Sequence, residues 1–61
     1  MRVREIISRI EADGWYQVGQ KGSHRQFKHP AKRGRVTVSG NPGDDVTKAN
    51  EHSILKQAGL K

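Results

Sequence analysis

The segment KGSHRQFKHP, residues 21–30, combines a tight-turn signal with a short strand. Lys21-Gly22 predicts a two-residue hairpin turn, because glycine readily accepts the positive φ that such turns need. The turn would join a strand over residues 15–20 to a second strand that begins at Ser23. The alternation of polar and apolar residues on both sides of the turn favours an antiparallel hairpin with one buried face.

The predicted turn also fixes a register for the hairpin. It would pair Val18 with Arg25 and Tyr16 with Phe27. Residues directly opposite each other share a face of the sheet, so Tyr16, Val18 and Phe27 would lie on the buried face. The solvent-exposed face would carry Gln17, Gly19, His24, Gln26 and Lys28.

A helix is predicted before the hairpin. Its apolar face has the spacing i, i+3, i+4 and i+7 and consists of Val3, Ile6, Ile7 and Ile10. Gly14 is the expected glycine just past the helix end, where a left-handed backbone is common, and Trp15 would then contact Ile10. We therefore interpret Trp15 as a structural residue rather than as a residue that stacks on a base.

A third strand and a second helix are predicted after the hairpin. The third strand covers residues 35–38, with Val36 and Val38 toward the core. The second helix follows a loop, with Asn50 as the predicted N-cap and Thr47 as an alternative, and it ends at Gly59. The predicted fold is therefore α+β, in the order α-β-β-β-α, with a three-stranded antiparallel sheet and both helices on one face.

Length and composition limit the protein class. The 61 residues contain no cysteine, and we expect one domain over residues 1–61 without disulfides. No apolar run exceeds two residues, so we expect no membrane span and a cytoplasmic protein.

The charge favours a polyanionic partner. Twelve Lys and Arg against six Asp and Glu give a net charge of +6. Residues 21–35 carry six of the basic residues and no acidic residue. This uneven distribution favours nucleic acid binding over a basic protein without such a partner.

His24 is the residue most suited to chemistry. It follows the predicted turn on the solvent-exposed face, and the ordinary pKa of histidine suits proton transfer near neutral pH. A histidine among cations can promote RNA cleavage by the RNA's own 2′-hydroxyl, a reaction that DNA cannot undergo. The alternative is an ordinary surface histidine. The candidate RNA-binding residues around it are Lys21, Gly22, Ser23, Arg25, Lys28 and Arg35.

The other histidines fit a metal site or catalysis less well. His24, His29 and His52 lack the spacing of metal ligands and have no cysteine beside them, so we predict neither a metal nor a cofactor. His29, before Pro30, is better explained as a turn residue than as a catalytic one.

Several segments together resemble a known family. Gly14-Trp15, residues 20–24 (QKGSH), residues 27–30 (FKHP), residues 36–38 (VTV) and residues 53–60 (SILKQAGL) resemble a HicA-type toxin of a bacterial toxin–antitoxin pair. Gly-Ser-His alone is a weak motif, but its combination with Ile-Leu-Lys-Gln-Ala-Gly is specific. The resemblance covers nearly the whole chain in order.

The resemblance implies more than the composition does. It implies a fold like that of double-stranded-RNA-binding domains and an mRNA interferase activity that needs no ribosome. It also implies that His24 is the catalytic residue. The implied partners are mRNA and a HicB-type antitoxin, with a monomer when free and a hetero-oligomer in the antitoxin complex.

The sequence departs from the family pattern in two places, and other functions remain open. Asn41 stands where the family usually has histidine in a His-Pro-Gly loop, and Ala49-Asn50-Glu51 stands where it usually has Gly-Thr-Leu. A non-catalytic RNA-binding module is one alternative, although Lys48 stands nearly alone where such modules cluster lysines. A protein whose basic surface binds an acidic partner is another.

Overall fold

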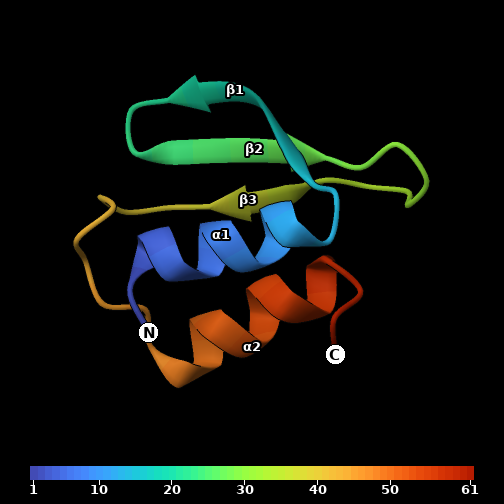
Figure 1. Ribbon diagram of the computed structural model, residues 1–61. Helices are drawn as coiled ribbons and strands as arrows, with labels where there is room; N and C mark the ends of the chain where they lie inside the picture. The colour runs from blue at the N-terminus through green and yellow to red at the C-terminus, as the bar shows by residue number, and fades with distance from the viewer.

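The computed structural model describes residues 1–61 and contains two helices and three strands. In chain order these are α1 (Val3–Ala12), β1 (Tyr16–Lys21), β2 (His24–Lys28), β3 (Val36–Val38) and α2 (Lys48–Gln57). The predicted α-β-β-β-α order is confirmed (Figure 1). Neither helix is long and apolar enough to cross a membrane.

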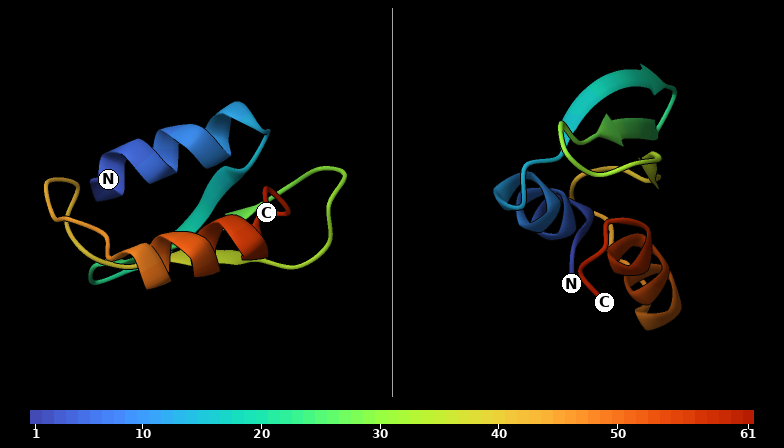
Figure 2. Two further views of the ribbon diagram at one scale, coloured as in Figure 1. Left: turned by 90° about the horizontal axis from the view of Figure 1, so that it is seen from below. Right: turned by 90° about the vertical axis from the view of Figure 1, so that its right-hand side faces the viewer.

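The strands form one antiparallel sheet in the order β1-β2-β3. Both helices lie on the same side of this sheet, which leaves its other side uncovered (Figure 2). β1 is an edge strand, and all six of its residues are exposed. We call the uncovered side of the sheet the outer face.

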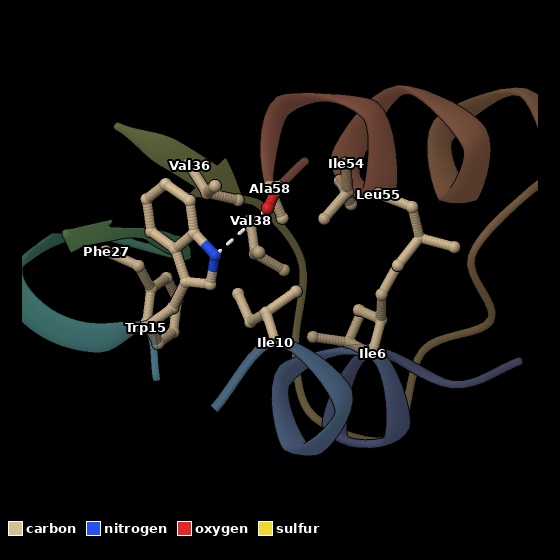
Figure 3. Packing of buried hydrophobic residues seen from close by; sticks show 10 residues of the cluster. Ile6, Ile10, Trp15, Phe27, Val36, Val38, Ile54, Leu55 and Ala58 are labelled. Carbon is tan, nitrogen blue, oxygen red and sulfur yellow. Dashed lines mark hydrogen bonds between the residues drawn. The ribbon is translucent and has the colours of Figure 1, made fainter. Parts of the chain in front are cut away.

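The core lies between the sheet and the two helices (Figure 3). Phe27, Val36 and Val38 supply the inner face of the sheet. The rest of the cluster comes from the helices and the residues that follow them, and it consists of Val3, Ile6, Ile10, Trp15, Ile54, Leu55 and Ala58. Alternation on β3, with Thr37 exposed between two buried valines, matches the pattern of the sequence.

Both helices end as predicted. The backbone N–H of Trp15 donates to the Ile10 carbonyl at 3.1 Å, with Gly14 at φ 109°. The backbone N–H of Leu60 donates to the Leu55 carbonyl at 2.8 Å in the same way. These bonds satisfy carbonyls that have no partner within the helix.

The predicted register of the β1–β2 hairpin is wrong. The turn is Gly22-Ser23, and Lys21 pairs with His24. Because Lys21 pairs with His24, Gly22 takes the first central position of the turn rather than the second, with φ 59°. A register shift between Gln17 and Gly19 then leaves Val18 as an extra residue in β1, which is a β-bulge.

The bulge changes the face of the sheet on which the first residues of β1 lie. Beyond it Tyr16 lies opposite Lys28 instead of Phe27. Tyr16 is 50% exposed and Val18 is 46% exposed, so the expectation that they belong to the core is wrong. An edge strand that bends at a bulge leaves the inner face of the sheet, and Gln17 now lies opposite Phe27.

The second helix begins earlier than its predicted cap at Asn50. Thr47, the alternative, is the N-cap, and its Oγ1 accepts a hydrogen bond from the Asn50 backbone N–H at 3.2 Å. The Asn41-Pro42-Gly43 loop before it contacts the start of α1. The Pro42 carbonyl accepts from the Arg4 N–H at 3.1 Å, and the Gly43 carbonyl accepts from the Arg2 side chain at 2.8 Å.

Candidate nucleic-acid interface

His24 is the first residue of β2 and lies on the outer face of the sheet. Phe27 on the same strand is buried, so strand alternation directs His24, Gln26 and Lys28 to the other side. His24 is exposed. The Gly22-Ser23 turn immediately before it holds the imidazole at one end of the sheet.

An open hollow lies beside the His24 side chain. It is lined by Lys21, Gly22, His24, Gln26 and Thr37. Lys21 is the residue opposite His24 across the hairpin, and Thr37 pairs with Gln26 on β3. All three strands therefore contribute to the hollow. A Cβ built on Gly22 would meet no atom within 4 Å, so this end of the hollow is open.

Two further predicted cations share this face. Lys28 is exposed at the far end of β2. Arg35 precedes β3, and its guanidinium donates to Gln26 Oε1 at 2.9 Å. Gln26 was predicted to be exposed but was not among the candidate site residues. Two sequence features could have identified Gln26 and Thr37 as site residues. Gln26 lies between His24 and Lys28 on the same side of β2, and Thr37 lies between two buried valines on β3.

Arg25 lies apart from this group. It pairs with Val38, which is buried, so its side chain leaves the sheet on the helix side. There its guanidinium donates to the Gly40 carbonyl at 2.9 Å. Of the predicted cationic site residues, Arg25 is the one that the fold does not bring to the outer face.

The acidic residues all lie outside the sheet and its connecting loops. Residues 14–43, which include the whole sheet, contain no acidic residue. The acidic residues lie in α1, at its C-cap, in the loop before α2 and in α2, and they are Glu5, Glu11, Asp13, Asp44, Asp45 and Glu51. The outer face is therefore basic without an internal counter-charge, which suits a polyanion.

His29 has a structural role, as its position before Pro30 indicated. Its Nδ1 accepts from the N–H groups of Ala31 and Lys32, each at 3.0 Å. Nδ1 therefore carries no proton, and Nε2–H donates to the Asp13 carbonyl at 2.7 Å. The ring also meets Trp15 edge to face, with centroids 5.3 Å apart.

Trp15 is likewise structural. It is 2% exposed, and its Nε1–H donates to the Ala58 carbonyl at 3.2 Å (Figure 3). The same carbonyl accepts from Lys32 Nζ at 3.0 Å. Histidine and carboxylate side chains form no cluster that could hold a metal ion.

The comparisons agree with this architecture. The family model described as the HicA toxin of bacterial toxin–antitoxin systems matches residues 3–60. A solved structure, a toxin–antitoxin complex from Streptococcus pneumoniae, contains a chain that is 33% identical. The superposition covers 98% of each chain with a TM-score of 0.81. No curated protein matches the chain in sequence.

The family model and the similar chain identify this protein as a toxin of a bacterial toxin–antitoxin pair. The chain belongs to the HicA toxin family.

Proposed function

We propose that this protein is an mRNA interferase, an endoribonuclease in which His24 is the general base. The observation that carries the proposal is the position of His24, exposed in a hollow on a face without acidic residues, in a chain of the HicA toxin family. Residues 1–61 would act as a single domain. Because mRNA is its proposed substrate, we propose that it acts in the cytoplasm.

The proposed reaction uses the 2′-hydroxyl of RNA as the nucleophile. Neutral His24 removes the 2′ proton, and the 2′-oxygen attacks the adjacent phosphorus. The bond from phosphorus to the 5′-oxygen breaks, and that oxygen takes a proton from solvent. The products are a 2′,3′-cyclic phosphate and a 5′-hydroxyl. The residues of this chain need to supply only a base and positive charge near the phosphate.

The cations of the outer face would bind the RNA backbone. Lys21 is opposite His24 and can stabilise the charge that develops on the phosphate oxygens. Lys28 and Arg35 extend the positive surface beyond the hollow. The open Gly22-Ser23 turn would let a phosphate approach the backbone beside His24.

We also propose that a HicB-type antitoxin neutralises the toxin by binding it. The similar Streptococcus pneumoniae chain was solved in a toxin–antitoxin complex, and the likeness covers almost all of both chains. The toxin would be a monomer when free and part of a hetero-oligomer with the antitoxin. An acidic antitoxin surface would complement the outer face.

Analysis of the cleavage products tests the chemistry. Single-stranded RNA incubated with the protein should yield fragments with 2′,3′-cyclic phosphate and 5′-hydroxyl ends. The same sequence with 2′-deoxyribose at the cleaved position should bind and remain intact. Cleavage of the deoxy-substituted strand at that position would contradict the mechanism, and binding without cleavage of either strand would indicate a non-catalytic RNA-binding module.

A further inference from the structure

Tyr16 is the one exposed aromatic side chain of the molecule, and it lies on the same face as His24. Trp15 before it is buried at 2% exposure, so alternation at the start of β1 directs Tyr16 away from the core. Its pairing with Lys28 gives the same placement independently. Tyr16 is not among the residues that pack against the core cluster.

The position of Tyr16 relative to His24 follows from the strands. Lys28, its partner, is four residues from His24 on β2. At about 3.3 Å per residue this separation is about 13 Å along the strand. Tyr16 therefore lies beyond the hollow, beside a lysine, at the opposite end of the same basic face.

The absence of core packing distinguishes Tyr16 from the other aromatic residues. Trp15 and Phe27 are buried and stabilise the fold. Tyr16 leaves about half of a large ring surface in solvent, in a region where residues 14–43 provide no acidic residue. An exposed aromatic ring beside cations is the arrangement with which proteins bind unpaired nucleotides, since bases stack on the ring and cations contact the phosphates.

We propose that Tyr16 is a base-stacking residue that binds an unpaired nucleotide at a distance from the cleaved bond. The inference rests on the proposed function and names its substrate as single-stranded RNA. One base would stack on Tyr16 while Lys28 contacts the adjoining phosphate, which would align the strand along β2 toward His24. Bases in a duplex stay stacked on each other, so duplex RNA would gain nothing from the ring.

Binding measurements on a non-cleaving protein test the inference. All variants carry His24→Ala, so that the RNA remains intact, and folding is verified by circular dichroism. Fluorescence anisotropy gives the Kd for a labelled single-stranded RNA and for an abasic ribose-phosphate oligomer of the same length. The variants are Tyr16→Ala, Tyr16→Phe and the control Gln17→Ala, whose residue is also exposed but lies opposite Phe27 on the other side of the sheet.

We expect Tyr16→Ala to raise the Kd for single-stranded RNA at least about 5-fold, the equivalent of ~1 kcal/mol for one stacked base. Tyr16→Phe and Gln17→Ala should leave that Kd within about 2-fold, because both keep an aromatic ring at position 16. The abasic oligomer should bind equally well to all variants. The dependence of this Kd on salt concentration should also be the same for all variants, since no cation is removed.

Two results would overturn the inference, and a third concerns the proposed function. Equal RNA affinity with and without the ring would overturn it and leave a protein partner as the occupant of this surface. An equal loss of affinity for RNA and for the abasic oligomer would overturn it too, because the ring would then act through the fold. If the parent His24→Ala protein binds no RNA at all, the RNA-binding proposal fails together with the inference.

Discussion

The Nε2–H of His29 donates a hydrogen bond of 2.7 Å to the backbone carbonyl of Asp13, where α1 ends. The His29 Nδ1 accepts two further hydrogen bonds from the loop between β2 and β3. His29 therefore connects this loop to the end of α1. His24 has no such partners and is exposed. Two histidines that lie five positions apart therefore have opposite roles, one in the fold and one in the proposed chemistry.

Substitution of each histidine should separate these roles. His29→Ala removes three hydrogen bonds from a side chain that is 10% exposed, so we expect the free energy of unfolding to fall by ~1–3 kcal/mol. His24→Ala should change it by less than ~0.5 kcal/mol, as is usual for exposed residues. Urea denaturation measures both values.

RNA cleavage should respond in the reverse order. His29→Ala protein, assayed below its unfolding transition, should retain cleavage, and His24→Ala protein should lose it. His52→Ala is the matched control, because His52 is exposed on α2 and should affect neither property. A stable His29→Ala protein without activity would assign the catalytic role to His29 instead.

The contact between Asp13 and Lys32 should make stability depend on pH. The hydrogen bond from the Lys32 ammonium lowers the pKa of Asp13 below its ordinary value of 3.8. Burial opposes this shift in part, and the positive charge of Lys32 adds to it. The folded state thus holds the ionised carboxylate more favourably than the unfolded state does. This stabilisation is complete above the ordinary pKa and is lost as the pH falls through the lower folded value.

Thermal unfolding of Asp13→Asn checks this dependence. The variant should have a lower Tm than the wild type at neutral pH, and the difference should shrink as the pH falls below 3.8. Glu11→Gln removes the same charge two residues earlier, from an exposed side chain, and should leave the Tm nearly unchanged. A difference that is constant from neutral to acid pH would show that Asp13 does not act through its charge.

Gly14 should be intolerant of a side chain. Its φ of 109° disfavours every other residue, and a Cβ there would lie 2.8 Å from His29 Nε2. We expect Gly14→Ala to lower the free energy of unfolding by ~1–3 kcal/mol. Gly43→Ala is the control, since Gly43 has no positive φ and open space around it. Equal denaturation midpoints for the two variants would contradict this account of Gly14.

Arg25 and Lys28 should differ in their effect on RNA binding. Lys28 lies on the outer face, whereas Arg25 donates to the Gly40 carbonyl on the helix side. Lys28→Ala should therefore weaken RNA binding and reduce the slope of log K against log salt by ~0.7, as for one lost phosphate contact with a single strand. Arg25→Ala should leave the slope unchanged and lower stability. A reduced slope for Arg25→Ala would show that Arg25 contacts RNA phosphates after all.

The elements that the sequence predicted well are those specified by local signals. The helix ends at Gly14 and Gly59 were predictable because each depends on one glycine and one apolar residue next to it. The buried valines of β3 were predictable from alternation alone. The predicted exposure of His24 is also confirmed, because the residue follows a turn whose glycine is evident in the sequence.

The hairpin register was not predictable in the same way. Gly22 suits either central position of a two-residue turn, and the choice between them shifts every pair. The only sequence signal for the bulge at Val18 is the neighbouring Gly19, since a glycine inside a strand often marks a bulge, and the outward position of Tyr16 was missed. The contacts of Lys32 and Trp15 with the Ala58 carbonyl join residues 26 and 43 positions apart, which no local pattern indicates.

Cleavage of mRNA in the presence of EDTA tests the central claim most directly. Purified wild-type protein and the His24→Ala variant, both folded and free of antitoxin, are incubated with the same transcript. The account predicts that the wild type cuts the RNA and that His24→Ala leaves it intact. Equal cleavage by both proteins, or cleavage by neither, would contradict the assignment of His24 as the general base of a metal-independent ribonuclease.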